Sequence, residues 1–175
     1  IIKPSQYYVF EDIEALRGLL LLSDQTIDVT DLGAGSRTGM GAKRMIRDIA
    51  KSSLKGKHDA QFLFRLVKHL DCNYCLELGT SLGLTSAYIA SGMNSGELIT
   101  IEGCPQTAKV AALNWKKLGI ERIDQRIGDF QELLPQIVGK VPQLDFVFFD
   151  GNHQHGPTIE YFEMCLNKAH DGSVF

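Results

Sequence analysis

Acidic residues lie in or directly after four strand-like runs between residues 74 and 150. Glu77 lies in the first run, Glu102 ends the second, Asp129 follows the third and Asp150 ends the fourth. In open α/β sheets a ligand binds beyond the carboxyl ends of the parallel strands, where residues that end the strands can face it. Carboxylates accept hydrogen bonds from hydroxyl and amino groups, and they can also hold a divalent cation. We therefore predict one ligand site around these acidic residues.

Two glycine-containing loops compete to hold an anionic part of that ligand. One spans residues 31–36 and the other residues 77–83, and each follows a strand-like run. Glycine lets the backbone approach a ligand closely, and the next helix N-terminus offers free N–H groups to an anion. Only the second loop is followed in order by a helix, a strand and an acid, Glu102. We predict that residues 77–83 hold the ligand. Residues 33–39 are either a structural turn or part of the active-site lining. In both cases we expect no contact between them and the anionic part of the ligand.

The glycine spacing in the second loop disfavours a dinucleotide. Gly79 and Gly83 form a G-x-x-x-G pattern, whereas dinucleotide-binding loops carry G-x-G-x-x-G, with one glycine that lets the backbone approach a pyrophosphate. An NAD-dependent dehydrogenase is therefore the weaker interpretation. The pattern is informative mainly in combination with the acids at the strand ends.

The elements that must position these residues alternate between strand and helix, which predicts a parallel sheet with helices on both faces, a Rossmann-like doubly wound α/β fold. The run 146–149 is apolar at every position, as in a strand covered on both faces. Residues 172–175 indicate a turn into a further strand, so we expect C-terminal strands beyond this chain. We predict an N-terminal helical extension over 1–57 and the core over 58–175. Expected strands are 27–32, 74–78, 97–101, 123–127 and 144–149, and expected helices are 11–22, part of 42–57, 60–70, 84–90, 107–118, 131–138 and 157–166.

The composition is that of an ordinary globular protein, with 44% hydrophobic and 22% charged residues among 175. The net charge of −3 gives no bulk electrostatic reason to bind nucleic acid or a membrane surface. The basic segment 43–57 is interpreted as a solvated face. Cys72 and Cys75 have the spacing of a metal or redox pair but lack a second pair, so the four cysteines are expected to be reduced thiols in a cytoplasmic protein.

Together, the segments 77–85, 98–105, 127–130 and 144–153 resemble the motifs of class I S-adenosylmethionine-dependent methyltransferases, specifically O-methyltransferases of the catechol and caffeoyl-CoA type. Residues 1–57 instead resemble an N-terminal extension of a bacterial branch of methyltransferases. The resemblance implies S-adenosylmethionine as the cofactor. It implies that Glu102 binds the ribose, Gly103 lies beside the adenine, Asp129 accepts the adenine amino group and Phe130 packs on the ring. The residues expected at the methionine end are Gly79, Thr80, Ser81, Gly83 and Thr85, and Glu77 and Gly128 complete the cofactor-binding set.

Asp150 stands where this resemblance implies a ligand of a catalytic divalent ion, such as Mg²⁺, near the transferred methyl group. The other two metal ligands of the family follow a fifth strand, beyond residue 175. The family carries Lys three residues after the Asp, and this chain has His153 there. An imidazole can take a proton from a hydroxyl at neutral pH, so Asp150 and His153 are the predicted catalytic residues.

The implied reaction is O-methylation of a hydroxyl on a small-molecule acceptor, without a membrane or nucleic-acid partner and with a homodimer left open. One alternative is an N-methyltransferase acting on a nucleic acid or protein. Such enzymes typically carry Asn/Asp-Pro-Pro-Tyr/Phe after the fourth strand, and this chain has Asp150-Gly151-Asn152-His153 instead. The other alternative is a non-catalytic nucleotide-binding Rossmann module, since a fold alone does not fix a function.

Overall fold

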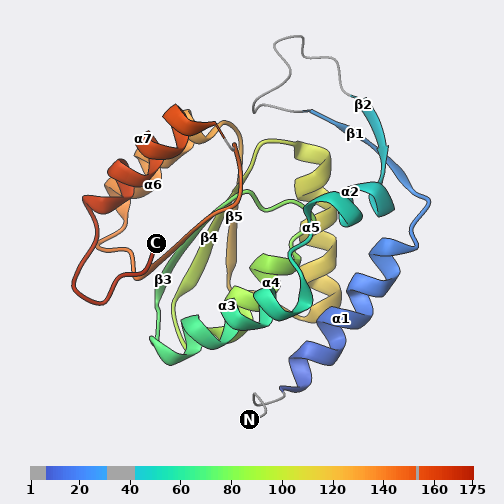
Figure 1. The fold of residues 1–175 in the computed structure, drawn as a ribbon, viewed down its shortest axis with the longest axis horizontal. Coiled ribbons are helices and arrows are strands. Elements are labelled where there is room, and N and C mark those ends of the chain that lie inside the picture. Colours follow the sequence, from blue (N-terminus) through green and yellow to red (C-terminus); the bar gives the residue numbers. More distant parts are fainter. Residues whose placement is uncertain (1–6, 31–41, 153) are drawn as a thin grey trace.

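The computed structural model describes residues 7–30, 42–152 and 154–175. Its centre is a four-stranded parallel sheet in the order β5-β4-β3-β6, with helices on both faces (Figure 1). The predicted α/β architecture is therefore confirmed. The core elements are α3 Lys57–His69, β3 Tyr74–Leu78, α4 Leu84–Gly92, β4 Glu97–Glu102, α5 Pro105–Leu118, β5 Ile123–Ile127, α6 Phe130–Lys140, β6 Phe146–Phe149 and α7 His155–Leu166.

Each face of the sheet has its own apolar core. On one face, α6 contributes Leu134 and packs against Leu76 of β3. On the other face, α3 and α4 contribute Val67 and Ile89, which pack in a cluster with Leu98 of β4. Figure 1 shows α6 and α7 on the left of the sheet, α4 and α5 on its right, and α3 along its lower end. Because both faces are covered, the neighbouring strands β3 and β6 are mostly apolar. The outer strand β5 is less buried and carries three polar residues between its two isoleucines.

The strand order reverses beside β3. The chain passes from β3 to β4 and β5 on one side, and then returns to place β6 on the other side of β3. The carboxyl ends of β3 and β6 are therefore neighbours at the topological switch point, where ligands of open α/β sheets bind. Beyond β6, Val174 forms a parallel bridge with Phe146, so the expected entry into a further strand is confirmed.

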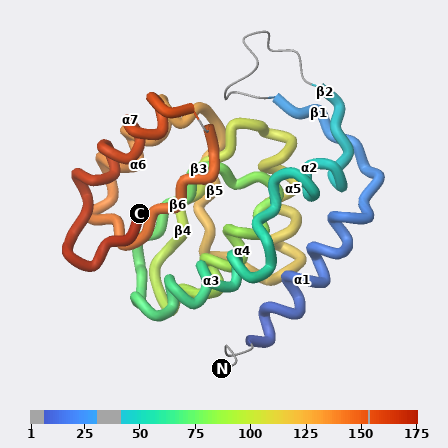
Figure 2. Tube along the Cα trace, in the orientation of Figure 1, coloured from blue at the N-terminus to red at the C-terminus, as the bar shows by residue number. Residues whose placement is uncertain are grey.

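The N-terminal segment forms α1 Tyr8–Leu21, β1 Thr26–Val29, β2 Ala42–Met45 and α2 Ile46–Ser53. The partly helical run predicted over 42–57 thus begins as a strand, which pairs antiparallel with β1. Phe10 and Ile13 of α1 share an apolar core with Tyr88 of α4 and Trp115 of α5. Figure 2 shows this segment along the α4 and α5 side of the molecule, away from α6 and α7. The domain division at residue 57 stays a prediction.

Among the described residues, no helix is long and apolar enough to cross a membrane.

Candidate active site at the strand ends

A cavity of about 180 Å³ lies at the carboxyl ends of the parallel strands. It brings together most of the residues that the sequence motifs single out, from four different strand ends. Among the described residues, its lining includes the predicted Gly79, Ser81, Glu102, Gly103, Gly128, Asp129, Phe130 and Asp150. It also includes residues that sequence reasoning missed, namely Thr30, Gly151, Asn152 and Tyr161.

Gly79 brings the loop after β3 into contact with the end of β6. Its φ is +105°, and a Cβ atom there would lie 2.5 Å from the carbonyl oxygen of Asp150. The Gly79 amide donates to the Ile101 carbonyl at 3.0 Å, which ties the same loop to β4. Only glycine fits both this backbone conformation and this close approach. The requirement for glycine at position 79 is therefore steric as well as conformational.

Glu102, at the end of β4, holds the second half of the loop. Its carboxylate accepts hydrogen bonds from the Ser81 amide at 2.8 Å and from the Cys104 amide at 3.0 Å. Burial raises the pKa of Glu102, and hydrogen bonds from the Cys104, Ser81 and Gly103 amides lower it, with a net upward shift. The Ser81 hydroxyl also lies 2.7 Å from the Ser53 hydroxyl at the end of α2. The N-terminal segment therefore touches the glycine loop directly.

Four predicted cofactor-binding residues do not belong to the cavity lining that the described residues form: Glu77, Thr80, Gly83 and Thr85. Glu77 is fully buried and accepts hydrogen bonds from the hydroxyls of Ser86 at 2.5 Å and Thr100 at 2.7 Å. The Thr80 hydroxyl lies 2.7 Å from the Thr100 hydroxyl and so belongs to the same set of hydrogen bonds. The contact of all four residues with a cofactor stays a prediction. The hydrogen bonds of Glu77 and Thr80 connect the loop to α4 and β4.

Burial changes the acid–base behaviour of Glu77. Desolvation raises its pKa to about 8, the hydrogen bonds from Ser86 and Thr100 act against this rise, and the charges of Asp150 and Glu102 add to it. Within the described part of the chain, its Oε1 atom has no hydrogen-bond partner. Glu77 is therefore largely neutral at neutral pH.

Phe130 and Asp129 form the side of the cavity next to α6. Asp129 caps α6 by accepting a hydrogen bond from the Gln131 amide at 2.7 Å. The Phe130 ring meets the Tyr161 ring edge-on, with centroids 5.8 Å apart. A Cβ atom at Gly151 would lie 2.7 Å from the Phe130 ring. The aromatic surface therefore depends on a glycine directly after Asp150.

Asp150 forms an ion pair with Lys55, whose Nζ lies 2.7 Å from Asp150 Oδ1. Lys55 lies between α2 and α3 and was expected to belong to a solvated basic face. The structure adds a specific partner that the pattern did not indicate, because the fold brings this segment over the end of β6. The Asp150 side chain is only 14% exposed, so the carboxylate of this pair is largely withdrawn from solvent, whereas the Lys55 side chain is 37% exposed.

Three further predictions concern His153, residues 33–39 and a metal ion. His153 and residues 33–39 lie outside the described residues, so the proposed proton acceptor and the rejected glycine loop stay predictions. Within the described part of the chain, no group of three His, Cys, Asp or Glu side chains could hold a metal ion. The Asp150 metal site also stays a prediction. All four cysteines are free and buried, as expected.

Comparison with known proteins identifies related sequences. Residues 76–175, more than half of the chain, match a family described as a methyltransferase domain. Over 128 residues the chain is 29% identical to the catechol O-methyltransferase of Mycobacterium tuberculosis, covering 72% of this chain and 54% of that protein. Over 135 residues it is 34% identical to the O-methyltransferase imqG of Aspergillus flavus, covering 73% and 52%. The chain spans about half the length of these curated relatives.

Solved structures share the architecture. The O-methyltransferase TomG of Streptomyces achromogenes, solved in complex with SAM, superposes with a TM-score of 0.63 at 27% identity, covering 69% of this chain and 55% of that one. An O-methyltransferase from Bacillus cereus, solved with SAH, has a TM-score of 0.67 at 22% identity, covering 97% and 64%. The family match starts within β3 and runs through every later strand of the parallel sheet, so this Rossmann-like chain belongs to the methyltransferase-domain family.

Proposed function

We propose that this chain binds S-adenosylmethionine and is the cofactor-binding part of an O-methyltransferase that acts on a small-molecule hydroxyl. The observation that carries the proposal is the convergence of the glycine loop, Glu102 and Phe130 on one cavity at the switch point of the sheet. Relatives named as O-methyltransferases, and neighbours solved with SAM or SAH, support the same assignment.

The residues of the cavity fit the cofactor in three places. Gly79 and Ser81 place the loop in the lining of the cavity, so the methionine part can lie against the loop. Glu102 offers carboxylate oxygens at the end of β4, where both hydroxyls of a ribose can donate to them. Phe130 offers a ring face to the adenine, beside the cap residue Asp129. When bound, S-adenosylmethionine supplies a methyl group that its own sulfonium activates.

The residues of this chain then position the acceptor and receive its proton. An in-line displacement gains most from holding the two reacting atoms in close, aligned contact. Asp150 places a carboxylate at the floor of the cavity, where it favours positive charge. His153 is the proposed acceptor of the hydroxyl proton. The missing Pro-Pro-Tyr/Phe sequence after Asp150 disfavours the N-methyltransferase alternative. A cytoplasmic location and a homodimer stay predictions.

The direct test is Glu102→Ala. A charge-assisted hydrogen bond contributes about 1.5–3 kcal/mol, so this change should weaken binding of S-adenosylhomocysteine at least about tenfold. Isothermal titration calorimetry measures the effect, and thermal unfolding confirms that the variant is folded.

Glu97→Ala is the matched control, because Glu97 begins the same strand and is exposed at its opposite end. The control should bind as the unchanged protein does. Equal affinity in the Glu102→Ala protein would refute the ribose assignment. Tighter binding of NAD than of S-adenosylhomocysteine would refute the proposed function.

A further inference from the structure

We propose that Lys55 is a positioning residue of the methyl-transfer centre: its ammonium supplies the positive charge opposite Asp150 that the family resemblance gives to a divalent ion. This inference rests on the proposed function, because it places Asp150 near the cofactor's sulfonium. Lys55 lies outside residues 76–175, which match the family. The assignment therefore comes from the contact between the N-terminal segment and the end of β6.

The ion pair between Lys55 and Asp150 is a close contact in which the carboxylate is largely buried. Lys55 Nζ lies 2.7 Å from Asp150 Oδ1, and the Lys55 side chain is 37% exposed against 14% for Asp150. The same Nζ lies 5.7 Å from the centre of the Phe148 ring, in β6. An isolated surface pair is worth little, but a carboxylate this far from solvent gains from a compensating cation. Lys55 therefore sets the charge at this end of the cavity.

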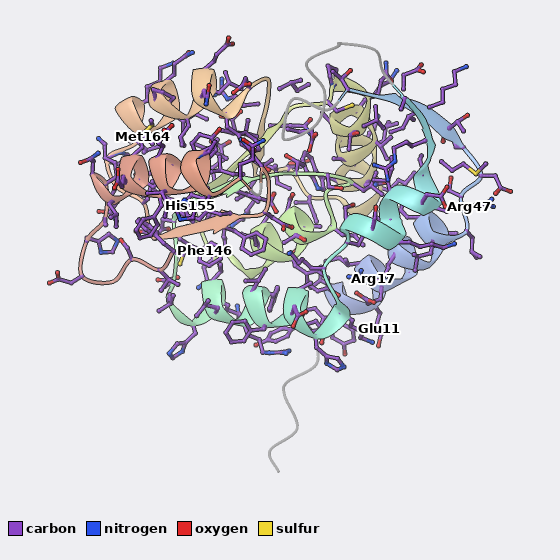
Figure 3. All side chains as sticks on the ribbon, turned by 45° about the horizontal axis from the view of Figure 1, so that its top comes forward. Glu11, Arg17, Arg47, Phe146, His155 and Met164 are labelled. Atoms are coloured by element: carbon purple, nitrogen blue, oxygen red, sulfur yellow. The ribbon has the colours of Figure 1, made fainter. Side chains whose placement is uncertain are left out.

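A partly buried network between α1 and α4 holds the backbone of Lys55. Arg17 Nη1 donates to the Lys55 carbonyl at 2.8 Å, and the Arg17 guanidinium pairs with Glu14 at 3.1 Å. Tyr88 of α4 donates to the same Glu14 carboxylate at 2.7 Å. Figure 3 labels Arg17 on α1, at the side of the helix that meets the α2–α3 segment. These hydrogen bonds thus connect the backbone of Lys55, whose side chain carries the ammonium, to α1 and α4.

An ammonium in this position has two electrostatic consequences. It repels the sulfonium of S-adenosylmethionine and leaves the uncharged sulfur of S-adenosylhomocysteine unaffected, whereas Asp150 attracts the sulfonium. It also donates hydrogen bonds and accepts none, so it can hold an acceptor oxygen on which negative charge develops. The Lys55 ammonium therefore offsets the charge of the Asp150 carboxylate beside the reacting sulfur.

The test is the ratio of the affinities for S-adenosylmethionine and S-adenosylhomocysteine, because these ligands differ by one methyl group and one charge. Lys55→Met keeps the apolar stem and removes the charge, and should shift the ratio about tenfold toward S-adenosylmethionine. Asp150→Asn should shift the ratio in the opposite direction. The double variant should return close to the starting ratio, because both charges are then absent. Calorimetry on all four proteins measures the cycle without knowledge of the methyl acceptor.

Two controls separate charge from structure. Lys55→Arg keeps the charge and should keep the starting ratio. Lys57→Met removes an exposed lysine two residues later and should also leave the ratio unchanged. If both ligands bind but Lys55→Met leaves their ratio unchanged, the role of Lys55 is refuted while the proposed function stands. If neither ligand binds the unchanged protein, the proposed function fails and the role of Lys55 fails with it.

Discussion

Gly79→Ala is expected to reduce the affinity for S-adenosylhomocysteine by at least ~100-fold and to destabilise the fold by about 2–4 kcal/mol, from backbone strain and overpacking together. The φ of +105° disfavours any side chain, and the new methyl group would lie 2.5 Å from the Asp150 carbonyl oxygen. Neither backbone can yield easily, because the Asp150 amide donates to the Leu78 carbonyl at 2.8 Å. Calorimetry and denaturant unfolding measure the two effects.

Gly119→Ala is the matched control for this change. Gly119 also has a positive φ, +67°, at the end of α5, but within the described residues nothing lies within 4 Å of the position of its Cβ. The control should lose about 1 kcal/mol of stability and keep its ligand affinity. If Gly79→Ala behaves like the control, the close approach of the loop to β6 is not what shapes the cavity.

Glu77→Gln is expected to remove a loss of folding stability that the unchanged protein shows as pH rises. Burial raises the pKa of Glu77 from its usual value of 4.5 to about 8. Between these values the folded protein retains a proton that the unfolded chain has released, so stability falls through this window and levels off above it. A neutral amide removes that dependence. Relative to the unchanged protein, the variant should gain about 3 kcal/mol between about pH 5.5 and about pH 8.5.

Urea unfolding at the two pH values measures this difference. Glu97→Gln serves as the control, since Glu97 is exposed and should show no change in relative stability with pH. If the stability of the Glu77→Gln protein relative to the unchanged protein is the same at both pH values, Glu77 is ionised in the folded state. The neutral state inferred for the Glu77 carboxyl group would then be wrong.

The sheet and much of the cavity were predictable because local patterns encode them. The apolar run that ends in Asp150 and the strand that ends in Glu102 each place an acid at a strand end, and parallel pairing brings those ends together. The glycine loop was distinguished by the order of elements that follow it. Such signals extend over a few dozen residues and do not require knowledge of tertiary packing.

The rest depends on contacts between distant segments. Lys55 stands in a run of basic residues that has the pattern of a solvated face, and only the packing of α1 and α2 brings its ammonium to Asp150. The strand Ala42–Met45 is almost entirely exposed and therefore has no apolar alternation to reveal it. Tyr161 reaches the cavity from α7 and Thr30 from directly after β1, and neither residue lies in the segments that resemble the family motifs. Composition and periodicity contain no information on such contacts.

The indole of Trp115 lies directly beneath the glycine loop, where Nε1 donates to the Gly83 carbonyl at 2.7 Å and the side chain is 5% exposed. The chain has a single tryptophan. The tryptophan emission of the chain therefore originates at one known place, an indole that is hydrogen-bonded to the loop that the ligand is proposed to touch. Because a buried indole is sensitive to its polar partner, a change in the loop on ligand binding will alter the emission. The protein carries its own fluorescent reporter of occupancy, with no dye or label required.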